Sequence, residues 1–139
     1  MAAAALIDSG PLVAAGNKRD RRHGLSVEFI AGFEGTLITT WPVLTEVCHL
    51  IPHSAAVRFM RSVAGGGIEV RDVPGEALAR IADMMEKYAD LPMDLADASL
   101  VWLGDETGIR DIATFDEWDF GTYRLTSGKR FNNVIPTRG

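Results

Sequence analysis

Four acidic residues from separate parts of the chain have side chains of the kind that bind divalent cations: Asp8, Glu46, Asp97 and Asp116. Carboxylates that meet without a cation repel each other and lose hydration, which raises their pKa values and makes the cluster unfavourable. Mg²⁺ and Mn²⁺ prefer carboxylate and water oxygens, and bound Mg²⁺ commonly keeps waters that a phosphate can replace. If these side chains converge, the chemistry they favour is phosphodiester hydrolysis by water.

Each acidic residue, taken alone, also has a structural explanation. Asp8 follows a short apolar segment, so it could cap the next helix, as could Ser9. Glu46 lies beside an apolar helical stripe and could simply be solvated. Asp94 precedes Asp97 by three positions, which fits a helix N-cap followed by an acidic first turn. We interpret Asp94 as the cap and Asp97, which two small residues follow, as a ligand.

The elements that would position these residues can be predicted from hydrophobic patterns. Short apolar or β-branched segments predict strands over residues 3–7, 36–40, 68–73 and 111–115. Helical periodicity and Pro or Gly boundaries predict helices over residues 9–15, 25–33, 42–50, 54–63, 75–88 and 94–107. In the second helix, Val27, Ile30 and Ala31 are expected to share the packed face. Residues 123–136 suggest one or two short edge strands.

Strands that alternate with helices predict an α/β fold, in which a mainly parallel sheet has helices on both faces. Ligands of such sheets bind beyond the carboxyl ends of the strands. Asp8 and Asp116 directly follow predicted strands, and Glu46 lies in the helix after the second strand. Asp97 lies in the first turn of a later helix. All four are therefore expected at the same edge of the sheet.

Length and composition limit the classes of protein that need consideration. A chain of 139 residues, with 47% hydrophobic and 24% charged residues, fits one globular domain over residues 1–139. No apolar run is long enough to span a bilayer, and no basic leader precedes the first apolar segment, so no membrane or signal segment is expected. Cys48 is the single cysteine, which excludes an internal disulfide and a cysteine-rich metal site. We expect a cytoplasmic protein.

The net charge of −5 disfavours a protein that merely coats nucleic acid, because neutralisation of phosphate drives non-specific binding. One short stretch is basic nevertheless, and its cations are candidates for contacts with RNA phosphates: Lys18, Arg19, Arg21 and Arg22. A solvated loop rich in Lys and Arg explains the same stretch equally well.

Taken in order, the acidic segments resemble a PIN domain, in particular the VapC-type toxin nucleases of bacterial toxin–antitoxin pairs. The resemblance is carried by LIDSGPL (6–12), TEV (45–47), MDLADASLV (93–101) and IATFDEWDF (112–120). It extends over essentially the entire chain. Any one segment is unspecific, but the four in this order are specific.

The resemblance implies a three-layer α/β/α fold and a Mg²⁺- or Mn²⁺-dependent endoribonuclease. Carried over by position, Asp8, Glu46 and Asp97 would be the main catalytic metal ligands, with Asp116 as the fourth. In this activity water attacks an RNA phosphodiester while a cation offsets the developing negative charge.

Further residues would support that site. Asp94 and Asp119 are additional possible ligands, ranked behind Asp97 and Asp116. Ser9 would orient Asp8 through its hydroxyl or backbone amide, and Thr114 would be a hydroxyl neighbour of the site.

The resemblance also implies an RNA substrate, a homodimer, and an antitoxin whose C-terminal part covers the acidic site. Two alternatives keep the fold: a standalone PIN nuclease in RNA processing, and a non-catalytic module that binds RNA or protein. A receiver-like phosphoryl-transfer domain also collects aspartates at strand ends. It would need a functional lysine late in the chain, and Lys129 has no clear strand context.

Overall fold

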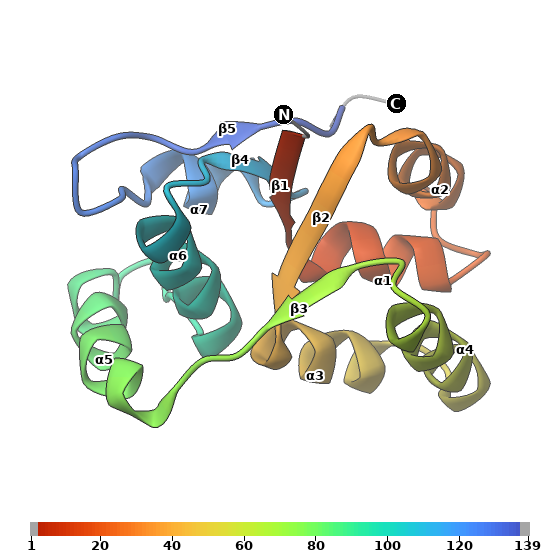
Figure 1. Cartoon of the computed structure of the whole chain (residues 1–139), viewed down its shortest axis with the longest axis horizontal. Coiled ribbons are helices and arrows are strands. Elements are labelled where there is room, and N and C mark those ends of the chain that lie inside the picture. Colours follow the sequence, from red (N-terminus) through yellow and green to blue (C-terminus); the bar gives the residue numbers. More distant parts are fainter. Residues whose placement is uncertain (1–2, 137–139) are drawn as a thin grey trace.

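A parallel sheet runs through the centre of the protein in a computed structural model that describes residues 3–136 (Figure 1). Its strands are β1 (Ala3–Ile7), β2 (Gly35–Thr40), β3 (Glu69–Arg71), β4 (Asp111–Ala113) and β5 (Asn132–Asn133). Their order across the sheet is β3-β2-β1-β4-β5, and every pairing between neighbours is parallel. The prediction of a mainly parallel sheet is confirmed.

Helices cover both faces of the sheet. They are α1 (Ser9–Gly16), α2 (His23–Gly32), α3 (Trp41–Leu50), α4 (His53–Ala64), α5 (Leu78–Lys87), α6 (Leu95–Thr107) and α7 (Glu117–Thr122), with a 3-10 turn, η1 (Gly75–Ala77), before α5. Helices α1, α2 and α4 lie on one side of β1 and β2, and α5 and α6 lie on the other (Figure 1). The three-layer α/β/α arrangement is therefore confirmed.

Strand β1 occupies the middle of the sheet and sets the position of the site. Leu6 pairs with Ile38 of β2 on one side and with Ile112 of β4 on the other. Ala5, Leu6 and Ile7 are completely buried. An uninterrupted apolar run is what a parallel strand needs when helices cover both of its faces. Asp8 is the first residue after this strand.

Helix α2 corrects one prediction. It begins at His23 rather than at residue 25, and two of the three residues predicted on its packed face, Val27 and Ala31, are exposed. Ile30 is half-buried as expected, but the other residues of α2 on the packed face are Leu25, Ser26 and Phe29. Because the buried residue Ser26 is polar, the apolar pattern of Val27, Ile30 and Ala31 predicted a packed face one position further along the helix.

The last quarter of the chain also differs from prediction. Strand β4 ends at Ala113 instead of residue 115, and the acidic segment after it forms the short helix α7. The expected edge strands are β5 and an isolated antiparallel bridge between Arg124 and Arg130.

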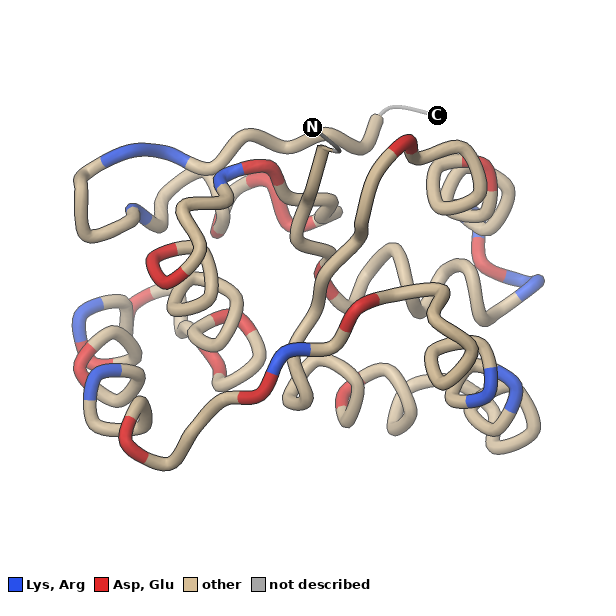
Figure 2. The backbone as a smooth tube through the Cα atoms, viewed as in Figure 1, with Lys and Arg blue, Asp and Glu red and all other residues tan. Residues whose placement is uncertain are grey.

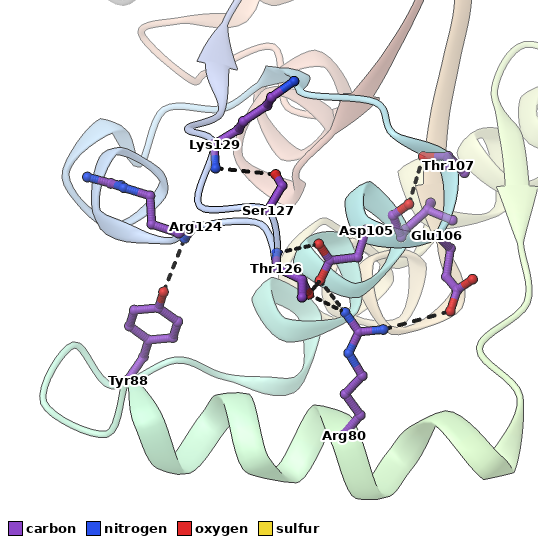
Figure 3. A network of polar contacts seen from close by, with 10 residues as sticks. Arg80, Tyr88, Asp105, Glu106, Thr107, Arg124, Thr126, Ser127 and Lys129 are labelled. Atoms are coloured by element: carbon purple, nitrogen blue, oxygen red, sulfur yellow. Dashed lines mark hydrogen bonds and ion pairs between the residues drawn. The ribbon is translucent and has the colours of Figure 1, made fainter.

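A polar network attaches α5 and the loop after α7 to α6 (Figure 3). The Arg80 guanidinium pairs with Asp105 and donates a hydrogen bond to Thr126 Oγ1 at 2.7 Å. The Asp105 carboxylate accepts hydrogen bonds from the Thr126 amide at 2.7 Å and from its hydroxyl at 2.9 Å. These bonds hold the C-terminal end of the helix whose first turn carries Asp97. Within residues 3–136, none of the helices has the length and apolar character needed to cross a bilayer.

Candidate metal centre

A cavity of about 470 Å³ lies beyond the carboxyl ends of β1 and β4. Its lining includes six carboxylates, those of Asp8, Glu46, Asp94, Asp97, Asp116 and Asp119. They come from the end of β1, from α3, from the start of α6 and from the start of α7. The structure thus brings together the four acidic residues predicted as ligands and the two ranked behind them.

Asp8 is buried, with 5% of its surface exposed, and both of its carboxylate oxygens accept hydrogen bonds. The backbone amide of Ser9 donates to Oδ1 at 2.8 Å, and the Thr114 hydroxyl donates to Oδ2 at 2.8 Å. Asp8, rather than Ser9, is the N-cap of α1. The amide of Ser9 orients the carboxylate, which is one of the two ways that the sequence suggested.

Thr114 connects two of the acidic residues. Its Oγ1 donates to Asp8 and accepts a hydrogen bond from the backbone amide of Asp116 at 2.9 Å. The side chain of Asn133 on β5 accepts from the Thr114 amide and donates to the Thr114 carbonyl, both at 3.1 Å. Asn133 was not predicted as part of the site, because nothing in the local sequence around it indicates a partner directly after β4.

Asp97 faces the cavity from the first turn of α6 and is half-buried. The hydroxyl of Tyr123 donates a hydrogen bond to its Oδ2 at 2.8 Å. Burial and the neighbouring Asp97 carboxylate raise the pKa of Tyr123, so the phenol stays protonated and remains a donor. Tyr123 is a second residue that the sequence did not indicate.

One oxygen from each of Asp97, Asp116 and Asp119 lies within 4.8 Å of the other two. Asp116 caps α7, and Asp119, three residues later, lies half-buried on the same side. The sequence ranked Asp119 behind Asp116, whereas the structure places both beside Asp97. Helix formation by residues 117–122 is the reason, since it brings residues three apart onto one face.

The remaining two carboxylates have different surroundings. Glu46 is half-buried on α3 and contributes to the negative field at Asp8, but it lies outside the group of three close oxygens. Asp94 is the N-cap of α6, and its Oδ1 accepts a hydrogen bond from the Asp97 amide at 2.8 Å. The capping interpretation of Asp94 agrees with this geometry.

The pKa values of three carboxyl groups show the electrostatic cost of this arrangement. Burial is the largest cause in each, and it raises the pKa of Asp8 to about 6, with smaller contributions from Glu46 and Asp116. Burial and then the charge of Asp8 raise the pKa of Asp97 to about 8. Burial and then the hydrogen bond with Asp116 raise the pKa of Asp119 to about 6. A bound cation would offset this repulsion.

The donor set fits a hard divalent cation. All the side chains offer carboxylate oxygens, which Mg²⁺ and Mn²⁺ prefer, and the cavity has room for coordinated waters. A hard cation of this kind is held by several carboxylate and water oxygens at once. The three close oxygens are separated by up to 4.8 Å, so small side-chain adjustments would let them reach one ion.

The four predicted basic residues do not lie together in one patch. The Arg22 guanidinium lies over the ring of Phe115, 4.5 Å from its centroid, and Phe115 lines the acidic cavity. Lys18 lines a different cavity, between α1, α2 and α4, while Arg19 and Arg21 are exposed. Most Lys and Arg residues lie toward the two ends of the molecule (Figure 2). Of the four predicted cations, Arg22 contacts a residue that lines the cavity, although Arg22 itself is not among the lining residues.

Known proteins with similar sequences and folds support the resemblance seen in the sequence. No family model matches the chain. Ribonuclease VapC26 of Mycobacterium tuberculosis is 29% identical over 135 residues, which cover 94% of this chain and 99% of that protein. The crystal structure of M. tuberculosis VapC20, described as a toxin that cleaves the sarcin–ricin loop, superposes with a TM-score of 0.79 at 22% identity. That match covers 96% of this chain and 100% of VapC20. Over nearly its whole length, the chain therefore resembles VapC-type PIN-domain ribonucleases in both sequence and fold.

Proposed function

We propose that this protein is a divalent-metal-dependent endoribonuclease that hydrolyses RNA phosphodiester bonds at the carboxylate cavity. The observation that carries the proposal is the convergence of six carboxylates in one cavity, with three of their oxygens within 4.8 Å of one another. The raised pKa values of Asp8, Asp97 and Asp119 mark a site whose charge favours a cation. The likeness to VapC26, a ribonuclease, gives the substrate class.

In this proposal Asp97, Asp116 and Asp119 hold the cation, and Asp8 and Glu46 complete the ring of negative charge. A bound Mg²⁺ or Mn²⁺ would supply a Lewis acid and positive charge for the phosphate in the transition state. Thr114 and the Ser9 amide keep the Asp8 carboxylate in one orientation. In the reaction a water oxygen bonds to phosphorus and the water gives up one proton, while the bond from phosphorus to one ribose oxygen breaks and that oxygen takes up a proton.

Arg22 is the proposed contact to the RNA backbone. Its guanidinium is held against Phe115 at the edge of the cavity, and the side chain of Asp20 accepts a hydrogen bond from the Arg22 amide at 2.8 Å. A cation fixed beside a negatively charged site can pair with a phosphate while the carboxylates hold the metal.

The proposal extends to a toxin role, in which the protein forms a homodimer and binds an antitoxin. Trp41, Leu78 and Leu95 are between 44% and 51% exposed, and they line an apolar groove of about 720 Å³ next to Glu46 and Asp94. Exposed apolar surface of this kind supports a protein partner, and in this proposal that partner is a second copy of the chain. A basic side chain of an antitoxin could pair with the carboxylates and exclude the metal.

Removal of the metal tests the proposed activity. The purified protein is incubated with total RNA in EDTA, and then with Mg²⁺ or Mn²⁺ restored in excess. We expect no cleavage in EDTA and defined product ends after restoration. Equal cleavage in EDTA would refute the metal-dependent mechanism. Arrest of growth on expression, relieved by an antitoxin encoded next to the gene, would distinguish a toxin from an RNA-processing nuclease.

A further inference from the structure

The hydroxyl of Tyr123 connects the segment after α7 to the first turn of α6. It donates a hydrogen bond to Oδ2 of Asp97 at 2.8 Å. The Tyr123 side chain is completely buried, so water does not compete for this bond. A buried phenol that gave up such a partner would lose a hydrogen bond without compensation.

Two other aromatic rings fix the direction of this hydroxyl. The rings of Tyr88 and Phe120 lie edge-on to that of Tyr123, with centroid distances of 5.0 Å and 5.1 Å and interplanar angles of 66° and 83°. Such edge-to-face contacts between buried rings restrict ring movement and stabilise the packing. The backbone amide of Tyr123 also donates to the carbonyl of Asp119 at 2.9 Å. The main chain and the ring of Tyr123 are therefore both held in place.

The hydrogen bond from Tyr123 engages one of the two carboxylate oxygens of Asp97. Oδ2 accepts from the phenol, and within residues 3–136 Oδ1 accepts no hydrogen bond. In this inference Oδ1 is therefore the oxygen assigned to the cation. A ligand whose rotamer is already fixed loses less conformational entropy when the ion binds. This reasoning rests on the proposed cation site, because it assigns to Tyr123 an effect on one of that site's ligands.

We propose that Tyr123 is a positioning residue, which increases the affinity for the divalent cation by holding the Asp97 carboxylate in its ligating orientation. Tyr123 is not among the residues that line the carboxylate cavity, so its proposed effect passes through Asp97. Hydrogen-bonding partners of metal ligands typically contribute about 10- to 100-fold to metal affinity or activity.

Tyr123→Phe tests this proposal, because it removes the hydroxyl and retains the ring that Tyr88 and Phe120 contact. Tyr88→Phe is the matched control. It removes a hydroxyl from the same aromatic cluster, but that hydroxyl accepts from the Arg124 amide at 3.1 Å (Figure 3). The side chain that donates to Asp97 is that of Tyr123. Mn²⁺ binding to the RNA-free protein is measured by electron paramagnetic resonance of the free ion, and cleavage is measured as a function of Mn²⁺ concentration.

We expect Tyr123→Phe to bind Mn²⁺ about tenfold more weakly. Its cleavage rate should return toward that of the wild type at saturating Mn²⁺, and Tyr88→Phe should match the wild type throughout. In a protein that already carries Asp97→Asn, Tyr123→Phe should cause no further loss of Mn²⁺ affinity. This second comparison separates an effect through Asp97 from a general loss of folding.

Three results would overturn the proposal. Equal Mn²⁺ affinity of Tyr123→Phe and the wild type would refute the positioning role and leave the proposed nuclease intact. An equal loss in both tyrosine variants would assign the effect to aromatic packing. Failure of the wild type itself to bind Mn²⁺ would refute the cation site and this inference together.

Discussion

Both oxygens of the Asp8 carboxylate have donors within the protein, the Ser9 amide and the Thr114 hydroxyl. The sequence could predict Asp8, because an acidic residue after an apolar strand is a local signal. It could not predict Tyr123 or Asn133, which lie 26 and 19 residues from the partners that they hold. Their roles depend on where the fold places the segment after α7 and strand β5. Local sequence thus predicted the acidic residues and both donors to Asp8, but not the donor to Asp97.

Thr114→Val removes the donor to Asp8 and the acceptor for the Asp116 amide while keeping the shape of the side chain. We expect RNA cleavage to fall by at least about tenfold, and the free energy of unfolding by about 1–2 kcal/mol, since buried groups lose their partners. Thr122→Val is the control, because the Thr122 hydroxyl donates to the Trp118 carbonyl on the exposed side of α7. Single-turnover cleavage and urea denaturation measure the two effects. Full activity of Thr114→Val would remove Thr114 from the site.

Arg22→Gln should weaken RNA binding and reduce the slope of log affinity against log salt concentration by about one, as expected for the loss of one phosphate contact. Arg21→Gln makes the same change of charge at an exposed position and should have the smaller effect. Fluorescence anisotropy over a salt series, with EDTA present to prevent cleavage, makes the comparison. Equal losses in the two variants would show that Arg22 acts only through overall charge.

Among the elements, α6 and α7 differ in how far the sequence predicts them. Helix α6 has strong local signals: Asp94 is its N-cap, and Gly108 ends it with a φ of 76°, a left-handed conformation that favours glycine. Helix α7 has only six residues, too few to show helical periodicity. The three close carboxylate oxygens depend on both helices. The spacing of the acidic residues therefore could not show that Asp119, like Asp116, lies beside Asp97.

Asp94 provides a test at the level of an element, because capping of α6 and binding of metal require different chemistry. Asp94→Asn keeps an oxygen for the Asp97 amide but removes the charge, so we expect nearly wild-type cleavage and stability. Asp94→Ala removes the cap and should lower the free energy of unfolding by about 1 kcal/mol. Cleavage assays and urea denaturation of both variants measure this. Loss of cleavage in Asp94→Asn would identify Asp94 as a ligand instead.

For the whole molecule, the alternation of strands and helices was sufficient to predict a parallel sheet with helices on both faces. The strand order β3-β2-β1-β4-β5 was not predictable in the same way, since it depends on which face each connecting helix covers. The net charge of −5 also has a clearer meaning in the structure. Six of the acidic side chains line one cavity, so part of the negative charge belongs to a site that would bind a cation.

The pH dependence of stability follows from that concentration of charge. Folding raises the pKa of Asp8 to about 6 and that of Asp97 to about 8, so the folded state binds more protons than the unfolded state between pH about 4 and pH about 8. Without divalent cations, this contribution to stability is present at low pH and is lost as pH rises toward 8. Asparagine does not ionise, so the Asp97→Asn variant should lose less stability than the wild type as pH rises.

We expect the Tm of Asp97→Asn relative to the wild type to increase between pH 5 and pH 8 in EDTA. Addition of Mg²⁺ at pH 8 should raise the Tm of the wild type more than that of the variant, since the cation binds the folded state. Differential scanning fluorimetry measures both. A difference in Tm that stays constant with pH would contradict the raised pKa of Asp97.

Asp8→Asn tests most directly whether the carboxylate cavity cuts RNA. Asparagine retains an oxygen for the Ser9 amide but removes the charge from the buried centre of the site. Asp83→Asn, at an exposed position on α5, is the matched control. With Mg²⁺ present, we predict full cleavage by the wild type and Asp83→Asn, and none by Asp8→Asn, although all three proteins unfold cooperatively. Undiminished cleavage by folded Asp8→Asn would contradict the account.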